Sequence, residues 1–158
     1  MNRLKDNYCI GSDLPFRSGI LGSSYRWQVD KGNGFVNLNN DDGYNGSQTQ
    51  LLRLYNASGS IYGFRYRCLV LKDGSWLESI VHTVKFANRW TGANSEAWED
   101  ASNWSCGRVP DEYTDVSIST NALRYPKLQS SGVCRSLTLQ TGAIVTVKSG
   151  YKLDIKAR

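Results

Sequence analysis

The chain has 158 residues, a net charge of +5 and a pI of about 9.1. Glycine and tyrosine are abundant and methionine occurs once, which favours β-structure with many turns. Basic residues are scattered among acidic ones without a clustered stripe, so we expect a solvated surface and no nucleic acid partner. No apolar run is long enough for membrane insertion, and the first six residues lack the apolar core of a signal peptide.

In chain order, the first half predicts short strands bounded by turns rich in Gly, Asn and Asp. The expected strands cover 14–18, 23–29, 35–38, 50–54, 62–70 and 79–86. Alternation places Tyr25, Trp27 and Val29 on one face, and the inward face of the central strand carries Tyr62, Phe64, Tyr66, Cys68 and Val70. Asp73-Gly74 predicts a hairpin turn. The turn at 39–43 has contiguous Asn and Asp residues, without the alternate spacing of a calcium loop.

Cysteines fall into two pairs, with Cys9 and Cys68 in the first half and Cys106 and Cys134 in the second. An even number without CxxC spacing predicts one structural disulfide in each half, formed in an oxidising extracellular compartment. Zinc is the alternative, but four-cysteine zinc sites use closely spaced pairs. We therefore expect no metal and no cofactor. Disulfides without an export signal predict a piece of a larger secreted protein.

A tryptophan between two cysteines, with Tyr66 two residues before the second, is the pattern of an immunoglobulin-like sandwich. There the indole packs on a disulfide between the sheets, and the tyrosine hydroxyl fastens a corner. The sequence thus predicts an all-β chain with an Ig-like β-sandwich over 1–87. Cys9 lies farther ahead of Trp27 than the usual strand-B cysteine does, so its bridge would reach from an edge segment.

The second predicted domain, 88–158, begins with a tryptophan-rich connector and ends in an internal repeat. Leu137, Val145 and Leu153 are eight residues apart, and so are Leu139, Val147 and Ile155, as well as Gly142 and Gly150. Short strands with a turn at a fixed period predict a small β-repeat domain, either solenoid-like or a meander. Both alternatives stay open, because two or three such units bury little of a solenoid core.

Both halves resemble segments of large secreted proteins of Bacteroidetes. The first resembles their repeated Ig-like modules through Tyr25-Arg26-Trp27-Gln28, the glycine-rich turn 31–35, Tyr44-Asn45-Gly46, the leucine strand 51–54 and Tyr66-Arg67-Cys68. The second, through Trp90-Thr91-Gly92-Ala93, Ala97-Trp98, Ala101-Ser102-Asn103-Trp104 and Gly107-Arg108-Val109-Pro110, resembles a segment that opens many surface-associated domains. Such segments are often followed by β-helix repeats and a type IX secretion sorting domain. The resemblance implies a secreted or cell-surface location.

No catalytic constellation emerges from the residues. His82 is the single histidine, and no nucleophile elbow of the Gly-x-Ser-x-Gly type occurs. Glycoside hydrolysis needs two carboxylates facing one bond. The available carboxylates lie in the tryptophan-rich connector or after a Pro-Asp-Glu turn: Glu96, Glu99, Asp100, Asp111, Glu112 and Asp115. We expect a chain that is not an enzyme.

Exposed aromatic side chains are the remaining candidates for binding, because planar rings stack on the C–H faces of sugars. Trp76 follows the hairpin turn and is the first candidate, with Tyr44 and Tyr62 as further ligand-binding residues, whereas Trp90, Trp98 and Trp104 are expected in a core. The expected function is a non-catalytic extracellular structural or adhesion module of a larger secreted or surface-anchored bacterial protein. The alternatives are a carbohydrate-binding module and an accessory fragment of a polysaccharide-degrading enzyme. The partner would be a polysaccharide or a cell-surface protein.

Overall fold

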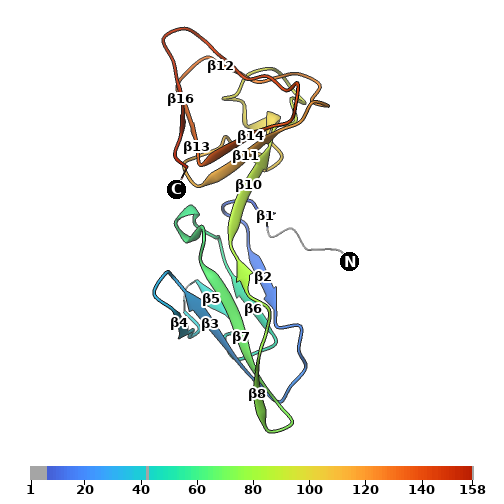
Figure 1. Ribbon diagram of the computed structural model, residues 1–158, viewed down its shortest axis with the longest axis vertical. Helices are drawn as coiled ribbons and strands as arrows, with labels where there is room; N and C mark the ends of the chain where they lie inside the picture. The colour runs from blue at the N-terminus through green and yellow to red at the C-terminus, as the bar shows by residue number, and fades with distance from the viewer. Residues whose placement is uncertain (1–6, 42, 158) are drawn as a thin grey trace. The chain divides into compact units, whose positions relative to one another are not determined.

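A computed structural model describes residues 7–41 and 43–157 (Figure 1). The predicted all-β fold class is confirmed, with 43% of the described residues in strands or bridges. The chain divides into two compact units, Met1–Lys85 and Phe86–Arg158, a division two residues before the expected boundary. Among the described residues, no helix is long and apolar enough to cross a membrane.

Two antiparallel sheets form the first unit. One contains β2 (Leu14–Arg17), β6 (Leu51–Leu54) and β5 (Tyr44–Asn45), in that order. The other contains β4 (Phe35–Asn37), β3 (Ser24–Asp30), β7 (Arg65–Lys72) and β8 (Ser75–Glu78), and β9 (His82–Thr83) also pairs with β7. Strand β1 (Asn7–Tyr8) precedes them, and the 3-10 turn η1 (Gly59–Ile61) leads into β7. Strand β7 runs the length of the unit (Figure 1).

Aromatic side chains join the two sheets. The Phe16 ring of β2 stacks on Tyr66 of β7 with 5.1 Å between centroids, and on His82 at 5.0 Å. Trp27 lies opposite Cys68 in the register of β3 and β7, and its indole Nε1 donates to the Thr49 carbonyl at 2.9 Å. Trp27, Tyr66, Cys68 and Val70 are buried as predicted, while Tyr62 and Phe64 lie before β7 and are half-buried.

The Tyr66 hydroxyl, expected to fasten a corner, meets another tyrosine. Tyr66 is fully buried, and its hydroxyl lies 3.1 Å from the hydroxyl of Tyr44 on β5 in the opposite sheet. Burial raises the pKa of Tyr66, and the hydrogen bond with Tyr44 raises it further. The pair therefore ties the sheets together through a neutral hydroxyl–hydroxyl hydrogen bond.

The predicted hairpin turn at Asp73-Gly74 is confirmed. Lys72 pairs with Ser75, so two residues close the hairpin between β7 and β8. Asp73 and Gly74 both have positive φ, at 50° and 79°, as a type I′ turn requires. This turn matches the right-handed twist of the strands and places Trp76 immediately after it.

Parallel ladders build the second unit. The first contains β10 (Lys85–Arg89), β11 (Thr114–Ile118) and β14 (Ser136–Leu139). The second pairs β12 (Lys127–Leu128) with β15 (Thr146–Val147), and the third pairs β13 (Gly132–Cys134) with β16 (Leu153–Ile155). From β11 onward the chain runs through the three ladders in turn twice. The first pass contributes β11, β12 and β13, and the second contributes β14, β15 and β16. The backbone therefore traces a three-sided path (Figure 1).

The eight-residue repeat does not correspond to structural units that stack on one another. Leu137 lies in β14, Val145 directly precedes β15, and Leu153 lies in β16, so eight residues separate successive sides of one pass. Stacked neighbours are instead more than twice as far apart along the chain, as in the pairing of Leu128 with Val147. Strands β14, β15 and β16 pair with the previous pass and not with one another, whereas consecutive strands of a meander pair antiparallel.

The tryptophan-rich connector is core, as expected from the sequence. Trp90, Trp98 and Trp104 are all buried, and the Trp104 ring makes edge-to-face contacts with Trp90 at 5.0 Å and with Trp98 at 4.7 Å. The 3-10 turn η2 (Ala101–Asn103) lies between Trp98 and Trp104. Edge-to-face pairs of this kind contribute about 0.5–1.5 kcal/mol each beyond the area that they bury.

The expected cysteine pairing is wrong. Cys9 and Cys106 are disulfide-bonded, whereas Cys68 and Cys134 are free and buried. Strand β2 contains no cysteine, and its buried side chains are Leu14 and Phe16, of which Phe16 stacks on Tyr66 of β7. This strand therefore offers no partner for Cys68. Cys134 is enclosed in the core around the three tryptophans. Burial raises the pKa of both thiols, that of Cys134 to about 11 with a smaller contribution from Asp115.

The Tyr44–Tyr66 pair predicts an asymmetry between two mutants. Tyr44→Phe leaves the buried Tyr66 hydroxyl without this partner and should lower the free energy of unfolding by about 1–3 kcal/mol. Tyr66→Phe leaves the half-buried Tyr44 hydroxyl, which water can reach, and should cost less. Urea unfolding of both variants measures the difference. A larger loss for Tyr66→Phe would contradict this account.

The cysteine arrangement predicts two reactive thiols per chain. Under denaturing, non-reducing conditions a thiol reagent should modify Cys68 and Cys134, and mass spectrometry should find Cys9 and Cys106 unmodified. Native protein should react slowly, because both free thiols are buried and have raised pKa values. Four reactive thiols, or none, would contradict the arrangement.

Candidate functional site

The three predicted ligand-binding aromatics do not lie together. Trp76 on β8 is 55% exposed and pairs in register with Leu71. Tyr44 contacts Tyr66, five residues back along β7, which corresponds to about 16 Å of strand. Tyr62 is half-buried and lies before β7 begins. A ligand on Trp76 would therefore not reach Tyr44 or Tyr62 within one compact site.

Exposed apolar side chains lie on both faces of β8 and in the segment after it, at the edge of the sheet. Strand β8 ends the order β4-β3-β7-β8, and all four of its residues are exposed. Leu77, Ile80 and Val81 are also exposed and follow Trp76 along the chain. We call Trp76, Leu77, Ile80 and Val81 the β8 edge. An exposed apolar strand at a sheet edge offers both side chains and unpaired backbone groups to a partner.

The single histidine has a structural environment. The His82 ring stacks on Phe16, and its Nε2 lies 3.1 Å from the Arg17 carbonyl oxygen. Its side chain is buried between the sheets of the first unit. His82 is therefore a packing residue of β9.

Most of the candidate carboxylates are engaged in local structure. Glu96 pairs with Lys127 at 2.6 Å, and Asp115 contacts Arg135 at 2.9 Å and the Ser136 hydroxyl. Asp111 accepts from the Tyr113 backbone N–H and the Thr114 hydroxyl. These contacts fasten turns and neighbouring strands. Among the described residues, no three His, Cys, Asp or Glu side chains gather into a potential metal site.

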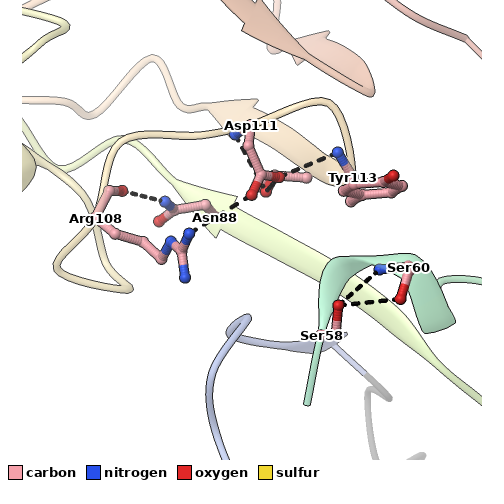
Figure 2. A network of polar contacts seen from close by, with 7 residues as sticks. Ser58, Ser60, Asn88, Arg108, Asp111 and Tyr113 are labelled. Atoms are coloured by element: carbon pink, nitrogen blue, oxygen red, sulfur yellow. Dashed lines mark hydrogen bonds and ion pairs between the residues drawn. The ribbon is translucent and has the colours of Figure 1, made fainter. Parts of the chain in front are cut away.

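Figure 2 shows how Asn88 of β10 holds the loop that carries Arg108 and Asp111. Asn88 is buried; its amide donates to the Arg108 carbonyl at 2.8 Å and accepts from the Cys106 backbone N–H at 3.0 Å. Arg108 reaches Asp111 at 3.6 Å. In the first unit, the Ser58 hydroxyl caps η1 by accepting from the Ser60 N–H. These polar contacts fix the course of loops.

Asp100 and Asn103 organise the loop around the tryptophan core. Asn103 is fully buried, accepts from the backbone N–H groups of Asn94 and Ser95, and donates to the Ala97 carbonyl. The Asp100 carboxylate accepts from the Ser102 hydroxyl and backbone N–H and from the Asn94 amide. The hydrogen bond from the Ser102 side chain, followed by that from Asn94, lowers the pKa of Asp100 to about 2.

A pocket of about 220 Å³ lies in the second unit, between the tryptophan loop, which carries Trp98 and Glu99, and the corner after β12. Its lining comes from three segments: Trp98 and Glu99, Val109 and Pro110, and the run Ser130, Ser131, Gly132 and Val133. Glu99 Oε1 accepts from the backbone N–H of Gln129 and from the N–H and hydroxyl of Ser130. The carboxylate thus fixes one wall of the pocket.

Sequence reasoning missed this pocket, because its lining residues are distant along the chain. Trp98 is expected in a core from its sequence context, and Glu99 is one carboxylate among several. The Ser130-Ser131-Gly132 corner is part of no motif, and only the pairing of β12 and β13 with the next pass fixes its position. No signal in a single sequence identifies the set.

The lowered pKa of Asp100 predicts a pH-dependent contribution to stability. Because the carboxyl group binds protons less readily when folded, its contribution is complete above about pH 4 and is lost as the pH falls toward 2. The stability difference between the wild type and Asp100→Asn should therefore shrink over that range. Urea unfolding at several pH values measures it. Asp154→Asn, which also removes one negative charge, serves as a control, and a difference that does not change with pH contradicts the assignment.

Comparison with known proteins reaches only the second unit. Residues 89–158 match a family described as "Domain of unknown function (DUF8693)". No curated protein and no solved structure gives a significant match to the chain. Over its tryptophan loop and parallel strands, the chain is therefore similar to a domain family that has no assigned function.

Proposed function

We propose that this chain is a non-catalytic structural or adhesion module of a larger secreted or cell-surface bacterial protein. The observation that carries the proposal is the contrast between its polar and apolar groups. The described polar side chains mostly cap turns and fasten loops, whereas an apolar sheet edge, the β8 edge, is left exposed. Such a surface suits docking better than acid–base chemistry.

The first unit is proposed to be an Ig-like sandwich. Its two antiparallel sheets, the pairing of Trp27 with Cys68 and the position of Tyr66 support this assignment. It departs from antibody-type domains in having a free Cys68 beside the tryptophan. Aromatic stacking of Phe16 on Tyr66 provides the contact between sheets at this level.

The second unit is proposed to be a short β-solenoid. Its parallel ladders, in which each strand pairs with the strand one pass earlier, support this interpretation, and Gly142 and Gly150 lie at the corners between its sides. Solenoid and Ig-like modules are both used as spacers and binding scaffolds in extracellular proteins. The Bacteroidetes origin and type IX secretion rest on sequence resemblance alone.

Adhesion would use the β8 edge. An edge strand can extend its sheet with a strand from a protein partner, and neighbouring apolar side chains add contact area. The partner would therefore be a cell-surface protein presenting an extended segment. The disulfide-bonded state of Cys9 and of Cys106 is compatible with an oxidising extracellular location.

A carbohydrate-binding module is the second candidate, and it rests on one residue. Trp76 is the exposed tryptophan of the chain, whereas Trp27, Trp90, Trp98 and Trp104 are buried. An exposed indole at a hairpin can stack on a sugar ring. This function would require no acid–base pair.

One experiment separates these functions: exposure of the oxidised protein to a panel of insoluble and soluble polysaccharides. The proposed function predicts no release of reducing ends, and any release would overturn it. Where the chain is retained on a polymer, Trp76→Ala should weaken binding about fivefold if the indole stacks on sugar. Leu77→Ala is the matched control, because residue 77 points to the other face of β8.

Retention that is unchanged in Trp76→Ala would remove the carbohydrate candidate from the β8 edge. Absence of retention across the panel would favour a protein partner for this edge.

A further inference from the structure

The two ends of the parallel ladders in the second unit differ in what covers them. At the first end, β10 pairs with β11, and the segment 96–98 pairs with β12, where the Trp98 N–H donates to the Lys127 carbonyl at 3.1 Å. The chain before β11 also supplies the buried rings of Trp90, Trp98 and Trp104. At the second end, β14, β15 and β16 each come last in their ladder, and no described strand pairs with their outer edges.

The register of the ladders shows which side chains of the second pass point toward the core. Partners in a parallel ladder lie on the same face of the sheet. On each of the three sides, a fully buried residue of the first pass pairs with an apolar residue of the second pass. The pairs are Ile118 with Leu139, Leu128 with Val147, and Cys134 with Ile155. The three second-pass residues point toward the core, yet they are 42%, 38% and 49% exposed. We call them, with the strands that carry them, the open end.

Polar side chains alternate with these apolar ones and point away from the core. They are Ser136, Thr138, Thr146 and Asp154. Asp154 is the one charged residue of the three strands, and it pairs with Lys152 at 3.2 Å. Edge strands in natural proteins are commonly protected from pairing with another chain by charged side chains that point inward. The open end instead carries apolar side chains at its inward positions.

The backbone of the second pass also has groups that face away from the first pass. The N–H groups of Thr146 and Lys148 donate to the carbonyls of Pro126 and Leu128, at 3.1 and 3.0 Å. Alternate residues of a strand direct their N–H and C=O groups to opposite sides, so those of Val147 face outward along the ladder. A partner that covers this surface must therefore supply hydrogen-bonding backbone as well as apolar side chains. Extended protein strands supply both, whereas lipid tails supply no hydrogen bonds.

A second copy of the chain offers a matching surface. Its open end has the same three strand edges and the same three apolar side chains, and a twofold axis across the end brings the two sets together. Strands of the two copies then run antiparallel, which is a favourable pairing for exposed edges. The inward side chains are uncharged, so no like charges meet among them. Because strands already cover β11 and β12 at the first end, each chain has one open end, and association stops at two copies.

We propose that the open end is a self-association surface, through which two copies of the chain join as a twofold dimer. Leu139, Val147 and Ile155 become buried against the other copy, and the outward backbone groups of β15 gain hydrogen-bond partners. The proposal rests on the ladders of the second unit and is independent of the adhesion function, which uses the β8 edge.

Sedimentation equilibrium of the whole chain, from micromolar to millimolar concentration, tests this proposal. We expect a reversible equilibrium between monomer and dimer, with no larger species. Val147→Lys places an ammonium group where the dimer would have to bury it, and it should weaken the dimer about tenfold or more. Thr146→Lys is the matched control, because it adds the same charge to the same strand on the outward face and should leave the dimer unchanged. Leu139→Lys and Thr138→Lys repeat the comparison on another side.

The β8 edge is also apolar, so Trp76→Lys is included to show which surface the two copies use. It should leave the dimer unchanged. A chain that stays monomeric at every concentration, or that forms larger oligomers, overturns the proposal. So does a dimer that dissociates in Trp76→Lys but persists in Val147→Lys and Leu139→Lys.

If the inward lysine variants do not fold, hydrogen exchange of the wild-type chain decides. The Val147 amide should exchange more slowly in concentrated than in dilute protein, because the dimer gives it a hydrogen-bond partner. Exchange of this amide that does not depend on concentration, in a chain that dimerises, overturns the assignment to the open end. Failure here leaves the adhesion function untouched, because that function is tested through the β8 edge.

Discussion

Hydrogen bonds from buried indole groups to backbone carbonyls are the interaction on which both units depend. Trp27 reaches Thr49 in the turn before β6, Trp90 reaches Arg124 before β12, and Trp104 reaches Trp98. Each bond satisfies a donor that burial removes from water and fixes a loop to the core. A ring thereby supplies apolar area and a point of attachment at once, which suits small domains with short strands.

Acidic and amide side chains extend the same principle to the loops. Asp100 and Asn103 satisfy the backbone of the tryptophan loop, and Glu99 holds the corner at Gln129 and Ser130. Because parallel strands of only two to five residues supply few ladder hydrogen bonds, the corners between them need side-chain partners. Carboxylates that look like candidates for chemistry in the sequence are used here to stabilise turns.

Two of the surfaces that remain after these structural roles are assigned differ in chemistry. The β8 edge is apolar and open, which suits contact with an extended protein segment or the face of a sugar polymer. The pocket lined by Trp98 and Glu99 is small and combines apolar side chains with a carboxylate. Trp76 on the β8 edge and Ser131 at the pocket are both exposed and can therefore be mutated separately.

The sequence by itself determined the local features whose cause is local. Alternation placed Trp27, Val29 and Tyr66 on buried faces, Asp73-Gly74 specified its turn, and the density of tryptophan around Trp98 indicated a core. An eight-residue period marked the sides of one pass, but which strands stack depends on pairing between passes, which spacing alone leaves open. Cysteine partners depend on distance in the folded chain, so two thiols expected in bridges proved to be buried and free. The pocket likewise exists only because the Glu99 loop and the Ser130–Gly132 corner, which are distant in sequence, meet in the fold.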